Sequence, residues 1–359
     1  MKVRAPGKLM VAGEYAVLHG AEAVVMAVDR HARIADADAP LADVPREVTA
    51  ALQIALREKE IGAVTDRWSL DVRALHDEGG RKLGLGSSAA ACVAAVGWHL
   101  AREGHDLGAP AVRARVADLA RRGHRAAQGG GSGVDVIASA HGGVVSVRFA
   151  EGLDGAATVR DCGALEGQHW AVLWSGTSAR TSEMITRAEA LRARDPGAFA
   201  ARMDAIGEAA RAVSAALHGR DAAAMTEAVR AHGEAMEAFG AAIGAPVVTD
   251  ALAALAAALR DLGAAVKPSG AGGGDDLAAR RARPRGPARR PAPRGASRVR
   301  AGRAGRGRPG RAHRVNDDDA DGRAMGDEGG RGGARGERGD RPEPAAGGRV
   351  ARELRRAAA

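Results

Sequence analysis

The stretch Gly84–Glu103 reads GLGSSAAACVAAVGWHLARE, a glycine-rich loop that runs into an alanine-rich helix. Glycines let the backbone approach a ligand closely, and the following helix aims its partly positive N-terminus at the same place. Ser87 and Ser88 could add hydroxyl donors to a phosphate or an oxygen ligand to magnesium. Serine is also favoured at any helix start. On its own, the stretch fits a plain helix start as well as an anion site.

The string 84–89 also matches the G-x-G-x-x-A fingerprint of dinucleotide-binding proteins, which should directly leave a strand. Here the seven residues HDEGGRK, 76–82, separate the glycines from the preceding apolar run. The pattern G-x-x-x-x-G-K-[ST] and the protein-kinase motif set do not occur in the sequence. The spacing therefore disfavours a dinucleotide-dependent oxidoreductase.

The rest of the sequence predicts an α+β protein in two halves. In residues 1–155 the apolar patterns predict strands at 9–12, 23–28, 68–75 and 144–149, with helices at 48–57 and 111–128. In residues 156–276 they predict strands at 170–174 and 266–269, with helices near 198–218, 222–242 and 249–262. Residues 277–359 form a low-complexity tail of Arg, Gly, Pro and Ala.

The positive charge of the chain belongs to its tail. The net charge is +9, but residues 277–359 hold 23 arginines, no lysine and 10 acidic residues, which leaves a net charge of −4 for residues 1–276. The tail has no aromatic side chain for base stacking, so only nonspecific contact with nucleic acid is expected. Cys92 and Cys162 form no C-x-x-C pair, and no stretch has the length of an apolar membrane span. We therefore expect a soluble cytoplasmic protein.

Two further segments accompany the loop at Gly84. Residues 5–18 read APGKLMVAGEYAVL and residues 267–275 read KPSGAGGGD. With GLGSSAA between them, these segments resemble, in order and spacing, the three signature motifs of the GHMP kinases. The resemblance covers residues 1–276 and implies a two-domain fold, an N-terminal ribosomal-S5-like domain (1–155) and a C-terminal ferredoxin-like α+β domain (156–276). It also implies ATP and Mg²⁺ as cofactors and a small-molecule substrate.

Within that family, three strings resemble the phosphomevalonate kinases. They are the Gly-Glu-Tyr at 13–15, HRAAQGGGSGVDVIAS at 124–139 and WSGTSARTSEMI at 174–185. The resemblance implies phosphorylation of phosphomevalonate to diphosphomevalonate in the mevalonate route to isoprenoids. A mevalonate kinase, another GHMP kinase or an inactive relic of one remain alternatives. An Arg-rich nucleic-acid-binding protein is supported only by the tail, so removing that tail would discriminate between the two classes.

The resemblance also implies roles for individual residues. Lys8 would stabilise the transferring phosphoryl group, and Asp135 would accept a proton or hold Lys8. The ATP phosphates would lie on Gly84, Leu85, Gly86, Ser87, Ser88 and Ala89, with Ser88 as magnesium ligand, and Gly270, Ala271 and Gly272 would pack against that loop. The substrate would contact His19, Ser132, Ser178, Arg180, Thr181 and Ser182. Each also has a plainer interpretation, such as a helix cap for Asp135 or a solvated surface position for Lys8.

The sequence departs from the family after the third motif. There the family continues with a strand, a helix and a further strand, whereas residues 277–359 show no apolar period of 2 or 3.6. A mixture of Arg, Ala, Gly and Pro without Lys is what a GC-rich gene yields when it is translated out of frame. We therefore expect a truncated C-terminal domain followed by an unpacked tail, whether frameshifted or natively disordered.

Overall fold

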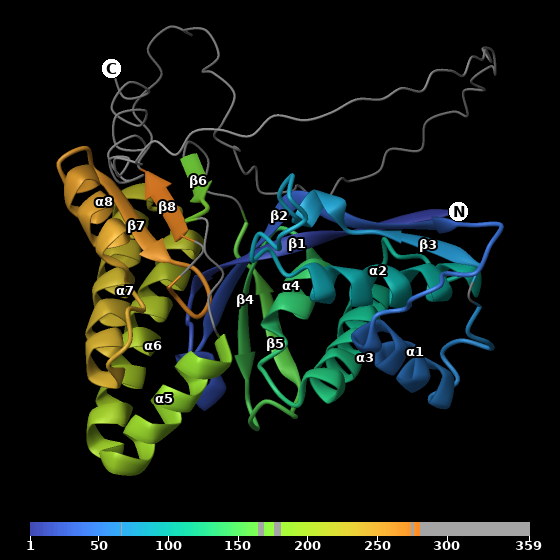
Figure 1. Ribbon diagram of the computed structural model, residues 1–359, viewed down its shortest axis with the longest axis horizontal. Coiled ribbons are helices and arrows are strands. Elements are labelled where there is room, and N and C mark those ends of the chain that lie inside the picture. Colours follow the sequence, from blue (N-terminus) through green and yellow to red (C-terminus); the bar gives the residue numbers. More distant parts are fainter. Residues whose placement is uncertain (66, 164–168, 176–180, 274–275, 281–359) are drawn as a thin grey trace, which may run out of the picture.

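The computed structural model describes residues 1–359 except 66, 164–168, 176–180, 274–275 and 281–359. Its elements form two groups (Figure 1). The first group comprises β1 (Lys2–Ala12), β2 (Ala23–Asp36), β3 (Trp68–Asp71), β4 (Val144–Phe149), β5 (Ala157–Asp161), the short 3-10 helices η1 (Ala16–His19) and η2 (Arg73–Leu75), α1 (Arg46–Arg57), α2 (Ser87–Arg102), α3 (Pro110–Gln128) and α4 (Val134–His141). The second comprises β6 (His169–Leu173), α5 (Thr181–Arg194), α6 (Pro196–His218), α7 (Ala222–Ile243), α8 (Asp250–Arg260), β7 (Ala264–Pro268) and β8 (Asp276–Arg280).

Each group is built on its own antiparallel sheet. The first sheet has the order β1-β2-β4-β5, and β3 pairs with the far end of the long strand β2. Helices α1 to α4 lie on one face of this sheet (Figure 1). The second sheet has the order β6-β8-β7 and packs with α7 and α8. The mixed α+β architecture predicted from the sequence is confirmed.

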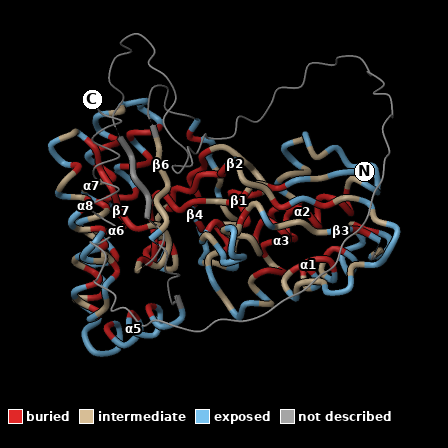
Figure 2. Tube along the Cα trace, turned by 45° about the horizontal axis from the view of Figure 1, so that its top comes forward, coloured by how far each residue is buried: buried red, intermediate tan, exposed pale blue. Residues whose placement is uncertain are grey.

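The two groups share one hydrophobic core. Helix α2 is buried continuously from Ala89 to Leu100, and Figure 2 shows it in the red interior of the first group. The same core includes Val213 of α6 and Ala265 of β7, from the second group. Small side chains permit this density, and a Cβ on Gly123 of α3 would lie 2.2 Å from the Cα atom of Ala51 on α1. In the described part of the chain, no helix has the length and apolarity that crossing a bilayer requires.

Strand β5 and helices α4 and α5 were not predicted from the sequence. Strand β5 pairs with β4, so the first sheet extends to Asp161 and the boundary proposed after residue 155 moves beyond that residue. Helix α4 begins directly after Gly133. The glycines before it are typical of a loop, so the apolar residues that follow were not recognised as a helix. Helix α5 has Thr181 and Ser182 in its first turn. All three elements are only five to fourteen residues long, which is too short for an apolar period to be recognised in the sequence.

The expectation that no strand follows the third motif is wrong. Strand β8 lies between β6 and β7, paired to Val172 through Leu277 and to Val266 through Ala278. Pairing on both sides satisfies the backbone of a central strand without any side-chain period, and five residues are too few to show one. The unpacked tail therefore cannot begin at residue 277, and the remaining prediction, for 281–359, lies outside the described residues.

Candidate active site

The glycine-rich loop turns directly into the N-terminus of α2. Gly84 and Gly86 adopt left-handed backbone angles, with φ of +72° and +71°, which glycine adopts at no steric cost. Gly86 is the N-cap residue, and no side chain caps the helix. The N–H groups of the first helical turn, from Ser87 onward, have no intrahelical acceptor. Together with the helix dipole, these donors form a place where a phosphate can bind.

Lys8, for which the sequence predicted a role in phosphoryl transfer, lies against this loop. Its backbone N–H donates to the carbonyl of Leu85 at 2.9 Å, and its ammonium group donates to the carbonyl of Gly84 at 3.4 Å. A Cβ on Gly86 would lie 3.0 Å from the side chain of Lys8, so any larger residue would have to displace that side chain slightly. The structure thus brings the one positive charge of the first motif onto the anion-binding loop.

Ser88 is held by a histidine from α3. Its hydroxyl lies 3.0 Å from Nε2 of His124, and the side-chain amide of Gln128 lies 3.2 Å from the same nitrogen. His124 is buried and Ser88 is half-buried. If Nε2 accepts a hydrogen bond from the hydroxyl of Ser88, the lone pairs of the hydroxyl oxygen are left for another partner. Neighbouring side chains often orient metal ligands in this way.

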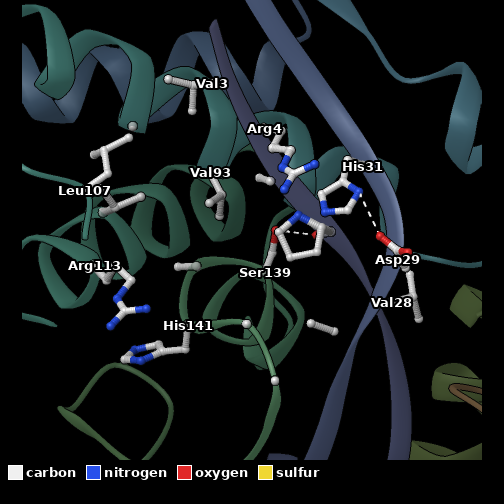
Figure 3. A pocket seen from close by; sticks show the side chains of 18 residues that line it. Val3, Arg4, Val28, Asp29, His31, Val93, Leu107, Arg113, Ser139 and His141 are labelled. Atoms are coloured by element: carbon white, nitrogen blue, oxygen red, sulfur yellow. Dashed lines mark hydrogen bonds and ion pairs between the residues drawn. The ribbon is translucent and has the colours of Figure 1, made fainter. Parts of the chain in front are cut away.

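Figure 3 shows a separate cavity of about 260 Å³ between the first sheet and helices α2 to α4. Arg4 lies beside His31 at one part of it, and Arg113 lies beside His141 at another. On α2 the cavity is lined by Val93 and Gly97, which lie two to three helical turns from the glycine-rich loop at residues 84–89. The cavity is therefore not the predicted phosphate site.

Asp135 is placed near β1 by its helix. One turn further along α4, Ser139 donates a hydrogen bond of 2.6 Å to the carbonyl of Pro6. Residues four apart share a helix face, so Asp135 lies on the side of α4 that packs on β1. Among the described residues, however, no ion pair within 4.0 Å joins Asp135 to Lys8. The hypothesis that Asp135 holds Lys8 directly is therefore not supported, and Oδ1 accepts from Val136 instead.

The third motif contacts the first motif, whereas the sequence predicted contacts to the loop at Gly84. The hydroxyl of Tyr15 donates to the carbonyl of Ala271 at 2.5 Å. A Cβ on Gly272 would lie 2.4 Å from the carbonyl oxygen of Val247, which requires glycine there. Gly270 has φ of +77°, and a Cβ on it would meet open space. The recorded contacts thus give Ala271 and Gly272 a packing role.

Sequence reasoning missed a buried charged cluster beside the third motif. Lys267 of β7 bonds Glu14 at 2.5 Å, and His232 of α7 lies 3.2 Å from the same carboxylate. All three side chains are almost completely buried. The signal for Lys267 was a lysine inside the apolar run AAVKP, since a buried lysine needs a partner. For His232, in the middle of an alanine-rich helix, the sequence carried no signal.

The predicted substrate residues are not all gathered. His19 is exposed and stacks edge-on against Phe199 of α6, where burial and Arg192 lower its pKa. Ser132 is half-buried, in the loop before α4. Ser182 is exposed at the start of α5, which also begins with Thr181. Ser178 and Arg180 lie outside the described residues.

A magnesium ion would have few protein ligands here. In the described ranges no group of three His, Cys, Asp or Glu side chains could hold a metal ion. Magnesium at phosphate sites commonly uses one or two protein oxygens and the substrate phosphates. The hydroxyl of Ser88, at the N-terminus of α2 and oriented by His124, fits that pattern.

Comparisons with known proteins agree with this arrangement. Residues 52–143 match the GHMP kinases N terminal domain, which includes the loop and α2. A phosphomevalonate kinase of Streptomyces sp. (strain CL190) is 29% identical over 333 residues, which cover 76% of this chain and 87% of that protein.

Solved structures share the fold. A Lin0012 protein from Listeria innocua has a TM-score of 0.68 at 23% identity, covering 78% of this chain and 90% of its own. Streptococcus pneumoniae phosphomevalonate kinase in complex with phosphomevalonate and AMPPNP has a TM-score of 0.61 at 22% identity, covering 78% and 92%. The domain match and the shared fold make this chain similar to the GHMP kinases, and the matched segment contains the glycine-rich loop that Lys8 contacts.

Proposed function

We propose that this kinase transfers the γ-phosphoryl group of ATP to phosphomevalonate. The observation that carries the proposal is the contact of Lys8 with the loop at the N-terminus of α2. The relative from Streptomyces, named phosphomevalonate kinase, supports the choice of substrate. So do the strings at 13–15, 124–139 and 174–185, which resemble the phosphomevalonate kinases.

Each part of the site has a task in this proposal. The residues Gly84, Leu85, Gly86, Ser87, Ser88 and Ala89 hold the ATP phosphates through backbone N–H groups and hydroxyls. Lys8 neutralises negative charge on the transferring group, where preorganised charge acts most strongly. Magnesium, held by Ser88 and the phosphates, would supply further positive charge. Because the acceptor is itself a phosphate and already ionised, Asp135 has a smaller role as a base than as an orienting group.

Substrate recognition falls to the groups outside the phosphate loop. Ser132, in the loop before α4, lies three residues from Asp135. His19, Thr181 and Ser182, with Ser178 and Arg180 from the segment 176–180, complete the proposed set. An acceptor with two anionic groups needs such hydroxyl and cationic partners, because a carboxylate and a phosphate must both be desolvated.

The test is an ATP-coupled assay of the full chain with phosphomevalonate and mevalonate side by side. We expect turnover with phosphomevalonate to exceed turnover with mevalonate, and kcat to fall by roughly 10²-fold or more in Lys8→Met. Arg46→Gln, at an exposed position of α1, serves as a matched control for loss of a surface cation. Faster turnover of mevalonate would overturn the choice of substrate and leave the kinase assignment intact.

A further inference from the structure

The first and third motifs are joined by alternate residues of one segment. Lys267 donates to the carboxylate of Glu14 at 2.5 Å and to the carbonyl of Met10 at 3.4 Å. Ser269 bonds both backbone groups of Met10, donating to its carbonyl at 3.0 Å and accepting from its N–H at 3.1 Å. The carbonyl of Ala271 accepts the hydroxyl of Tyr15. We call Glu14, Tyr15, Lys267 and Ser269 the motif junction.

These contacts reach a short stretch of β1 that lies between two irregularities in its pairing with β2. The pairing of β1 with β2 is irregular between Pro6 and Lys8 and again between Met10 and Ala12. The segment from Lys8 to Met10 is therefore bounded by two register shifts, where a ladder bends and loses bonds. Ser269 supplies the partners for Met10 at one end of this segment, and the loop at Leu85 holds Lys8 at the other.

The ionisable groups at and beside the junction are buried away from bulk solvent. Lys267 and His232 show no exposed surface, and Glu14 is 3% exposed. The N–H of Gly13 donates to Nε2 of His232 at 2.9 Å, so this nitrogen carries a lone pair and the ring is neutral. Burial raises the pKa of Glu14, and the Lys267 cation acts against that rise. The ionised form of Glu14 consequently depends on Lys267.

A buried ion pair of this kind is a poor source of stability. The cost of removing both charges from water commonly cancels their attraction, and apolar replacements of similar size are often neutral or stabilising. Tyr15 adds to the cost, because a non-glycine residue at φ of +59° is strained. Groups that cost folding free energy in this way are more often found where a protein must hold one arrangement of its residues and no other.

We infer that the motif junction positions Lys8 on the phosphate loop, so that its residues act on phosphoryl transfer through Lys8 without touching the substrate. The inference rests on the proposed role of Lys8. It gives Glu14 and Lys267 a task that neither the phosphate contacts nor stability explains.

The decisive variant replaces the ion pair by apolar side chains, Glu14→Met with Lys267→Met. A positioning role predicts a thermal midpoint within a few degrees of the wild type, a kcat lowered about tenfold or more, and a smaller change in KM for ATP. Ser269→Ala should lower kcat in the same direction. The control is Arg115→Met with Glu60→Met, which removes the ion pairs of Arg115 with Glu60, Glu58 and Asp118 and should leave kcat unchanged.

Amide hydrogen exchange supplies a readout that needs no substrate. In the double variant we expect faster exchange at Lys8, Leu9 and Met10, with α2 and α3 unchanged. If the wild-type chain phosphorylates an acceptor other than phosphomevalonate, the proposed substrate is wrong, and kcat is then compared with that acceptor. Wild-type exchange at these amides, or a kcat that falls only in proportion to the unfolded fraction, would overturn the inference.

Discussion

The glycine-rich segments 84–90 and 270–273 are similar in sequence and differ in what surrounds them. The first leads into a helix buried along its length, and its free backbone donors stand beside Lys8. The second leads toward a strand, and its backbone is occupied by Tyr15 and Val247. Glycine serves ligand approach at Gly86 and close packing at Gly272. The composition of a loop therefore predicts its backbone freedom, and the element after it decides the use of that freedom.

The largest effect on catalysis is expected from a substitution of Lys8, which lies on the first of these two loops. Lys8→Met should lower kcat by roughly 10²-fold or more, because charge stabilisation of a transferring phosphoryl group contributes several kcal/mol. Stability should change little, since the ammonium makes one long hydrogen bond. Steady-state kinetics with purified protein, alongside a thermal unfolding curve, measures both. A near-normal kcat would place Lys8 among ordinary surface lysines.

Alanine at the two glycines should separate ligand approach from packing. In Gly272→Ala the new Cβ meets the backbone oxygen of Val247 at 2.4 Å, at φ of +79°, so unfolding should become easier by about 2–4 kcal/mol. In Gly86→Ala the clash is with the flexible side chain of Lys8, and about 1 kcal/mol is expected from the positive φ. Chemical denaturation gives these free energies, and kcat should fall more in Gly86→Ala per unit of stability lost. Equal stability losses would contradict the distinction.

Elements with a long local pattern could be predicted from the sequence, whereas contacts between distant residues could not. Helix α2 and the long helices α6 and α7 were visible because apolar residues recur over many turns. Lys8 and Ser88 were found because short motifs carry them, and His124 because it stands in a recognisable string. Strand β8 and the ion pair of Glu14 with Lys267 were not, since partners 253 residues apart are set by tertiary packing.

The hydroxyl of Ser88 offers a finer test of the phosphate loop. His124→Leu removes the group that orients this hydroxyl, so the Mg²⁺ concentration at half-maximal rate should rise about tenfold. His124→Gln, which keeps an acceptor, should show a smaller rise. His218→Gln on α6, where the ring bonds a backbone carbonyl, is the control and should leave the Mg²⁺ dependence unchanged. An unchanged dependence in His124→Leu would mean that Ser88 needs no orienting partner.

The smallest expected effect is a pH dependence of stability at the third motif. Burial and the Lys267 cation hold the pKa of His232 well below its usual value near 6.5. As the pH falls through 6.5, the unfolded chain takes up a proton that the folded chain refuses, so stability falls. Glu14, the other charged group facing this ring, acts in the opposite sense, because its raised pKa favours proton uptake by the folded chain at lower pH.

Urea unfolding at pH 7.5 and pH 5.5 measures this balance. A single histidine that stays neutral when folded can cost at most about 1.4 kcal/mol per pH unit below the pKa of the unfolded chain, so the loss at pH 5.5 should be about 1 kcal/mol. His232→Gln does not titrate, and its stability should differ less between the two pH values. Because the N–H of Gly13 donates to His232, exchange at Met10–Tyr15, corrected for its intrinsic pH dependence, should become faster at the lower pH. Identical slopes for wild type and His232→Gln would show that His232 takes up its proton without opening the contact between the first and third motifs.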